Sequence, residues 1–179
     1  PAFPFKRSPV GAFPIRSLIL LLLAAARAPA AAPIPLALGT EKNQVEVKEV
    51  DDGWEIKVTG GDPWIWTSTF PAGTALAETS VLALVYQATD SVGWTFFARA
   101  EAGYGIRPGW SGKTNTWAPF ALPLAFYDTG DNRALDCSRL RMGFGGPVGK
   151  VVKLRNLYLR APNAQDMKLV EALMKKRAA

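Results

Sequence analysis

Three side chains of the kinds that recognise sugars occur close together in the stretch Gly103–Gly112. Tyr104 and Trp110 supply aromatic rings, and Arg107 between them supplies a planar guanidinium group. Aromatic rings pack against the apolar C–H face of a pyranose, and a guanidinium can donate paired hydrogen bonds to vicinal hydroxyls. The glycines in this stretch predict a loop, so we expect a carbohydrate-binding loop. The alternative is that both rings fold back over the end of the domain.

The residues before this loop alternate as a half-buried strand does, with Trp94 and Phe96 on one side and Thr95 and Phe97 on the other. This pattern predicts that Trp94 and Phe96 help to form the core. The same expectation holds for the other tryptophans that lie in predicted strands, namely Trp54, Trp64, Trp66 and Trp117. Among these, Trp66 is the one that we add to the candidate binding surface.

Two features of the composition exclude whole classes of site. The sequence contains no histidine, which excludes Ser-His-Asp and Cys-His nucleophiles and zinc sites that use imidazole. Cys137 is the only cysteine, so no internal disulfide can form, and we expect it to be a small buried residue.

The net charge of +6 belongs to the two ends of the chain. Residues 1–32 carry four basic and no acidic side chains, and residues 164–179 carry four basic and two acidic ones. Residues 33–163 contain 13 basic and 13 acidic side chains, so the body of the protein is neutral. A neutral body does not predict a nucleic-acid partner.

The first 32 residues have the parts of a secretory signal peptide. Basic residues precede the apolar run Leu18–Ala26, and Ala28–Ala30 offers a cleavage site between small residues. The apolar run is shorter than the roughly 20 residues that a membrane-spanning helix needs. We therefore expect a secreted or periplasmic protein, with an uncleaved membrane anchor as the alternative. Residues 33–40 are rich in Ala and Pro, which predicts an extended and mobile spacer.

Residues 41–163 are expected to form an all-β sandwich of about eight short antiparallel strands. The turn Asp51–Gly53 predicts a hairpin, and the apolar stretch Ser80–Ala88 predicts a central strand. Two prolines in Thr116–Phe126 predict an edge strand or a broken strand. Gly145–Gly149 is expected to close a second hairpin, and a phase shift near Asn156 predicts a bulge.

After Pro162 the pattern changes to helical spacing, with Asn163 as the N-cap and Asp166 three residues later. Met167, Val170, Leu173 and Met174 lie on one face of this predicted amphipathic helix. Residues 164–179 are therefore expected either to pack on the sandwich as a short C-terminal helix or to begin a further domain.

Three stretches, Thr59–Trp66, Trp94–Phe97 and Ser138–Arg160, together resemble the galactose-binding-like jelly-roll domains. These β-sandwiches are similar to the carbohydrate-binding modules that accompany secreted bacterial glycan-active proteins. The resemblance covers roughly Glu41–Asn163. It implies a jelly-roll sandwich, a polysaccharide or glycan as partner and a covalently linked catalytic domain, but it carries over no ligand residue position by position.

Two weaker candidate sites accompany the loop. Asp128, Asp131 and Asn132 could hold a structural Ca²⁺ through oxygen ligands, although an ordinary turn explains them as well. Basic residues alternate along the last two predicted strands and form either a stripe for an acidic polysaccharide or a solvated face paired with Glu46, Glu49 and Glu55. These basic residues are Arg139, Arg141, Lys153 and Arg155.

A glycosidase needs two carboxylates at a fixed separation, and Glu101 beside the loop has no partner implied by spacing. We therefore expect a non-catalytic carbohydrate-binding or accessory module that needs no cofactor. The alternatives are a structural or interaction sandwich of an envelope protein and, less favoured, a glycan-active hydrolase or lyase.

Overall fold

Strands with alternating apolar side chains form two antiparallel sheets in the computed structural model, which describes residues 32–74, 76, 80–97, 105–126 and 138–178. The described residues belong to one structural unit, Ala31–Ala179. Sheet A contains β1 (Ile34–Pro35), β3 (Val45–Val50), β4 (Gly53–Val58), β6 (Val81–Ala88), β9 (Thr114–Pro123) and β11 (Val151–Arg160). Sheet B contains β2 (Leu38–Asn43), β5 (Trp64–Thr67), β7 (Val92–Phe97), β8 (Gly105–Ser111) and β10 (Arg141–Gly145).

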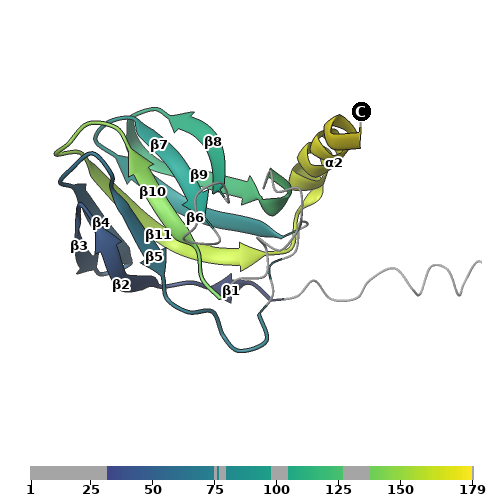
Figure 1. Ribbon diagram of the computed structural model, residues 1–179, viewed down its shortest axis with the longest axis horizontal. Coiled ribbons are helices and arrows are strands. Elements are labelled where there is room, and N and C mark those ends of the chain that lie inside the picture. The colour runs from purple at the N-terminus through teal and green to yellow at the C-terminus, as the bar shows by residue number, and fades with distance from the viewer. Residues whose placement is uncertain (1–31, 75, 77–79, 98–104, 127–137, 179) are drawn as a thin grey trace, which may run out of the picture. The chain divides into compact units, whose positions relative to one another are not determined.

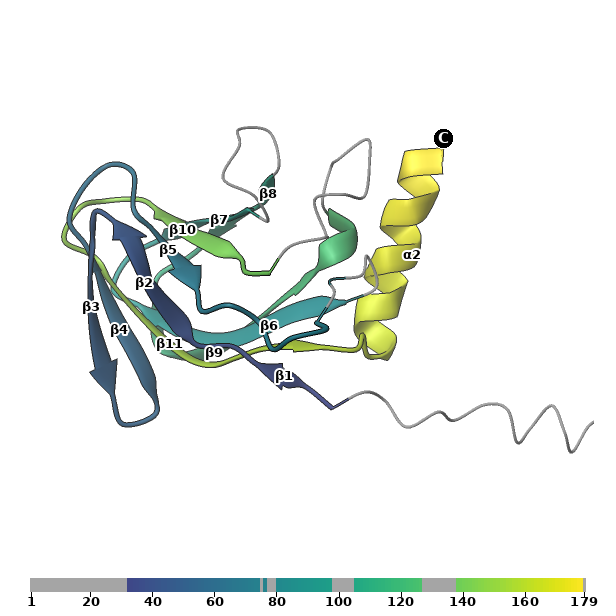
Figure 2. The same ribbon diagram turned by 60° about the horizontal axis from the view of Figure 1, so that its bottom comes forward.

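The two sheets lie face to face, as Figures 1 and 2 show. The strand order is β3-β4-β11-β6-β9 in sheet A, with β1 also paired to β11, and β2-β5-β10-β7-β8 in sheet B. Every pairing is antiparallel. The expected jelly-roll β-sandwich with a short C-terminal helix is confirmed.

Several local predictions are confirmed. Strands β3 and β4 form the expected hairpin, with Val50 opposite Gly53. Strand β6 lies between β11 and β9, which makes β9 an edge strand. Its prolines are tolerated because the outer side of an edge strand needs no ladder hydrogen bonds. The register of β11 shifts between Arg155 and Tyr158, and Asn156 between them has a φ of 52°, in the left-handed region. The predicted bulge near Asn156 is therefore confirmed.

The core is filled by the inward residues of both sheets. Trp94 and Phe96 of β7 are each 1% exposed, as the alternation predicts, and the apolar residues of β10 point to the same interior. The Trp94 ring meets the Tyr86 ring edge-on at 5.4 Å between centroids, and its Nε1 donates to Ser111 Oγ at 2.9 Å. The one polar group of the indole is thereby satisfied, so the ring can be buried at little cost.

Three expectations about connections are wrong. Residues 33–40 are not a free spacer, because β1 pairs with β11 and Leu36 is buried. Gly145–Gly149 does not close a hairpin, because β10 pairs with β5 and β7 in sheet B while β11 pairs with β4 and β6 in sheet A. Much of the predicted loop Gly103–Gly112 is strand β8, an edge strand paired with β7.

Helix α2 (Ala164–Ala178) follows β11 and contacts the short helix η1 (Leu124–Phe126) and β9 (Figure 2). Asn163 Oδ1 accepts hydrogen bonds from the backbone N–H groups of Gln165 and Asp166, and Asp166 accepts one from the N–H of Asn163. The predicted N-cap is therefore confirmed as a reciprocal capping box.

The guanidinium of Arg160 binds the carboxylate of Asp166 and joins the end of β11 to α2. Burial alone would raise the pKa of Asp166. Hydrogen bonds from Arg160 and from the Asn163 amide, together with the charge of Arg160, outweigh burial and lower that pKa below its usual range. This pair, together with the capping box, anchors the start of the helix.

A buried lysine stabilises the connection that passes from β10 of sheet B to β11 of sheet A. Lys150 is 3% exposed, and its Nζ donates to the backbone carbonyls of Ser91 and Gly145. Burial lowers the pKa of Lys150 to about 8, and the nearby carboxylate of Asp90 opposes this shift. A Cβ at Gly146, whose φ is 137°, would stand 2.5 Å from Nζ, so glycine leaves the room that this amine occupies.

This lysine predicts a pH dependence of stability. Between pH 8 and 10.5 the unfolded chain holds a proton on Lys150 that the folded protein has released, so the free energy of unfolding should rise with pH. Urea unfolding at several pH values should show this rise in the wild type and in the control Lys57→Met, an exposed lysine. The rise should be lost in Lys150→Met, and equal slopes in all three proteins would contradict the assignment.

Candidate functional site

Aromatic and basic side chains gather on the outer face of sheet B, the face turned away from the core. The register places Arg141 of β10 directly opposite Trp66 of β5 on one side and Phe97 of β7 on the other. Since facing residues in a sheet point the same way, these three form a row across the middle of the sheet. Trp64, two residues before Trp66, lies on the same face. We call the group Trp64, Trp66, Phe97, Arg139 and Arg141 the sheet B platform.

Guanidinium groups lie over the rings of the sheet B platform. The Cζ atom of Arg141 is 4.3 Å from the ring centroid of Phe97, 5.2 Å from that of Trp64 and 5.9 Å from that of Trp66. Cζ of Arg139 is 4.4 Å from the Trp66 ring. These are cation–π distances, and they leave Trp66 only 4% exposed although it faces outward.

The two arginines differ in how their charge is balanced. Arg139 forms an ion pair with Glu41, with 2.8 Å between Nη1 and Oε2. Arg141 has no ion pair with any residue that the structure describes, and its buried Nε has no hydrogen-bond partner there. Within the part of the chain that the structure describes, the charge at the centre of the sheet B platform therefore has no counter-ion.

A fixed hydrogen-bonding group stands beside Trp64. The indole Nε1 of Trp64 donates to Asp62 Oδ2 at 3.2 Å, and Asn43 Nδ2 donates to the same oxygen at 3.1 Å. The backbone N–H of Asp62 donates to Gln44 Oε1 at 2.6 Å. These bonds hold the turn before β5 and set an acidic acceptor at the rim of the sheet B platform.

Gly143 of β10 stands between Trp64 of β5 and Thr95 of β7 on the outer face of sheet B. A Cβ at Gly143 would lie 2.0 Å from Thr95 Oγ1, so any larger residue would displace that side chain. The Thr95 side chain therefore occupies the space over Gly143 and places a hydroxyl on this face of sheet B. Rings, guanidinium donors, a carboxylate acceptor and a hydroxyl are the elements of a sugar-binding surface.

The residues predicted from the sequence fall in three groups. Trp66 lies on the sheet B platform, beneath the two arginines. Arg107 and Trp110 lie in β8, the strand next to β7, with Trp110 opposite Gly93 in register, but their side chains lie outside the described structure. Tyr104 and Glu101 lie outside the described residues, as do the suggested calcium ligands Asp128, Asp131 and Asn132.

The expectation that the tryptophans in the predicted strands are buried in the core is partly wrong. Trp94 belongs to the core and Trp54 packs against it, whereas Trp64 and Trp66 lie on the outer face of sheet B. Trp117 lies on the outer face of sheet A, with the Cζ of Arg155 4.1 Å from its ring. The alternation Trp-Ile-Trp was the available signal, since it places Ile65 inward and both tryptophans outward.

The suggested single basic stripe is also wrong, because its members belong to different sheets. Arg141 lies on β10 of sheet B, while Lys153 and Arg155 lie on β11 of sheet A. Lys153 pairs with Glu55 at 3.5 Å, as the sequence suggested, and Arg155 pairs with Asp52 at 2.8 Å. The paired, solvated-face alternative therefore describes the β11 residues.

Other kinds of site receive no support from the described residues. Among them, no three His, Cys, Asp or Glu side chains cluster in a way that could hold a metal ion. In the same part of the chain, no helix has the length and apolar character to cross a membrane.

Comparison with known proteins identifies the fold. No protein-family model matches the sequence, and no curated protein matches it. A solved carbohydrate-binding module of family 29 is similar with a TM-score of 0.56 and 11% identity, covering 78% of this chain and 94% of that one. A variant of the module CBM29-2 complexed with mannohexaose has a TM-score of 0.57 and 12% identity, covering 78% and 98%.

A second CBM29-2 variant, complexed with cellulohexaose, has a TM-score of 0.57 and 11% identity and covers 78% of this chain and 97% of its own. The expected similarity to the sandwiches of carbohydrate-binding modules is thereby confirmed at the level of the fold. Sequence identity this low does not extend the likeness to the ligand.

The sheet B platform predicts how Arg141→Met will behave. The methionine should keep an apolar stem on the rings, and the buried Nε of Arg141 has no hydrogen bond to a described residue that could be lost. The free energy of unfolding should therefore fall by less than about 1 kcal/mol. The control Arg160→Met leaves Asp166 buried without its partner and should cost about 3 kcal/mol. Urea unfolding measures both values. A larger loss for Arg141→Met than for Arg160→Met would contradict this description.

Proposed function

We propose that this protein is a non-catalytic carbohydrate-binding module that binds a glycan chain along the sheet B platform. The observation that supports this most is the row of Trp66, Arg141 and Phe97 across three adjacent strands, extended by Trp64. The row crosses the strands, so a chain of sugar rings laid along it would meet rings and guanidinium groups in turn. The partly exposed rings of Trp64 and Phe97 would contact the C–H faces, and Arg141, supported from below by the buried Trp66 ring, would donate to hydroxyls.

Rigidity favours binding at this surface. The rings are held on β-strands, and the guanidinium of Arg141 is already stacked on them, so little conformational entropy remains to be lost when a ligand binds. The solved modules of similar fold complexed with mannohexaose and cellulohexaose support a hexasaccharide-sized ligand for this chain also.

A binding role is favoured over an enzymatic one by the state of the two described carboxylates beside the sheet B platform. Glu41 is paired with Arg139, and Asp62 accepts hydrogen bonds from Asn43 and Trp64. A glycosidase needs one carboxyl group that is protonated as an acid and a second that acts as base or nucleophile. Neither of these two acids is arranged for such a role. The similar solved proteins are likewise binding modules.

The proposal is tested by isothermal titration with mannohexaose and cellohexaose. Trp64→Ala should weaken binding roughly thirtyfold, since a central aromatic contact contributes about 2 kcal/mol. Trp117→Ala removes a tryptophan from the outer face of the other sheet and should bind as the wild type does. Absence of binding to either hexasaccharide and to a wider panel of neutral glycans would favour a structural or interaction sandwich instead.

We further propose that the module is exported and serves as an accessory part of a glycan-handling protein, linked to a catalytic domain. The signal-peptide pattern of residues 1–32 and the location of most polysaccharides outside the cell support this. Expressed in a bacterium, the chain should be recovered from the periplasm or medium without its first residues. Deletion of Leu18–Ala26 should retain it in the cytoplasm. Mass spectrometry of both fractions decides, and recovery of the intact chain in the cytoplasm would contradict export.

A further inference from the structure

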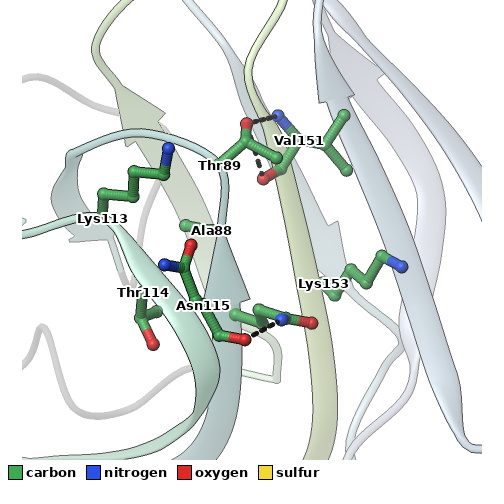
Figure 3. Close-up of a pocket in the computed structure, with 8 residues that line it drawn as sticks. Ala88, Thr89, Lys113, Thr114, Asn115, Val151 and Lys153 are labelled. Atoms are coloured by element: carbon green, nitrogen blue, oxygen red, sulfur yellow. Dashed lines mark hydrogen bonds between the residues drawn. The ribbon is translucent and has the colours of Figure 1, made fainter.

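A hollow lies on the outer face of sheet A, where strands β6, β9 and β11 meet. It has a volume of about 290 Å³. We call it the sheet A hollow; the lining residues that matter are Gln87, Thr89, Lys113, Asn115, Val151 and Lys153 (Figure 3). Because the sheet B platform lies on the outer face of the other sheet, the whole thickness of the sandwich separates the two surfaces.

An irregularity in the pairing of β6 and β9 accounts for this hollow. Ala118 stands opposite Tyr86, but Thr114 stands opposite Ala88, so β9 has two more residues than β6 over the same interval. The extra residues move the start of β9 away from the ladder, as a bulge does. A space is thereby opened beside Gln87.

The walls of the sheet A hollow are held in place by hydrogen bonds. Gln87 Nε2 donates to the backbone carbonyl of Asn115 at 2.7 Å, which ties β9 to β6 across the gap. Thr89 Oγ1 accepts from the backbone N–H of Val151 at 2.9 Å, which ties the end of β6 to β11. The hollow therefore exists before any ligand binds, and Figure 3 shows both bonds.

The basic and amide side chains of the sheet A hollow differ in whether they have partners. Figure 3 shows Lys113 and Asn115 on the β9 side, with the ammonium of Lys153 extended to the opposite side. Lys153 is paired with Glu55 at 3.5 Å, whereas Lys113 has no ion pair with any described residue. The side-chain amide of Asn115 likewise has no hydrogen bond to the described residues. The ammonium of Lys113 and the amide of Asn115 thus stand on the same wall without partners in the described part of the chain, and two such donors are suited to a carboxylate.

The size and the remaining walls match a single sugar residue. A space of about 290 Å³ is at the small end of the range for ligand sites. Val151 offers an apolar patch. Among the described residues only Nε2 of the Gln87 amide is engaged, so its Oε1 atom can accept a hydrogen bond from a hydroxyl. The hollow thus combines a carboxylate site with a hydroxyl acceptor.

We propose that the sheet A hollow is a second binding site, which takes the uronic acid residue of an acidic polysaccharide. The inference rests on the proposed carbohydrate-binding function but uses different residues and a different ligand. With one site on each face of the sandwich, the module can hold two polysaccharide chains at once. Such bivalency raises the apparent affinity for a mixed polysaccharide matrix without any new contact.

The test is isothermal titration of the full domain with tetragalacturonate, in low salt and in about 0.5 M NaCl. Wild-type protein should bind at low salt and more weakly at high salt. Lys113→Ala should weaken binding about tenfold, because it removes a charge-assisted hydrogen bond, and Asn115→Ala should weaken it also. Lys48→Ala is the matched control, since Lys48 is an exposed lysine on the distant strand β3 of the same sheet. It should leave the affinity unchanged.

Three outcomes would overturn the proposal. The first is that the wild type does not bind tetragalacturonate at low salt. The second is that Lys48→Ala and Lys113→Ala lose affinity equally. The third is that Trp64→Ala loses binding of tetragalacturonate, which would assign the acidic ligand to the sheet B platform. A parallel titration with cellohexaose keeps the two proposals separate. Failure of the neutral ligand alone counts against the sheet B platform, and failure of the acidic ligand alone counts against the sheet A hollow.

Discussion

The packing of Trp94 between the two sheets is the interaction on which the rest of the structure depends. Its ring meets Tyr86 and Phe120 of sheet A at 5.4 and 5.0 Å between centroids, and Phe144 of its own sheet at 5.9 Å. Ser111 of the neighbouring edge strand accepts the hydrogen bond of the indole. One side chain thus joins both layers and fastens β8, so the sheets hold a fixed spacing and orientation.

A sandwich that buries one side of every strand leaves its outer faces available for binding. Both faces here carry tryptophans covered by arginines, which shields the rings from water while keeping them near the surface. The two faces differ in charge balance. Arg155 over Trp117 is neutralised by Asp52, whereas Arg141 over Trp64 has no described partner. This difference is why the sheet B platform, and not the Trp117 side, is the candidate main site.

Local sequence patterns predicted local features well. The β3–β4 hairpin, the edge position of β9, the bulge at Asn156 and the capping box of α2 depend on neighbours a few residues apart, so the relevant physics is contained in short windows. The predicted connections were wrong where the paired strands are far apart in the sequence. The stretch Gly145–Gly149 has the composition of a hairpin turn, yet it passes from one sheet to the other. Alternation shows which side of a strand is buried, but it does not show which sheet the strand joins.

The candidate sites show the same division. The sequence by itself determined the fold class, the inward set of Trp94, Met142 and Phe144, and the presence of aromatic and basic residues suited to sugars. Only the tertiary structure decided that Trp64 and Phe97, 33 positions apart in the sequence, meet on either side of Arg141. It also assigned Arg141 and Lys153 to different faces. The reason is that strand order and register bring distant residues together, and these are set by packing of the whole sandwich rather than by any local pattern.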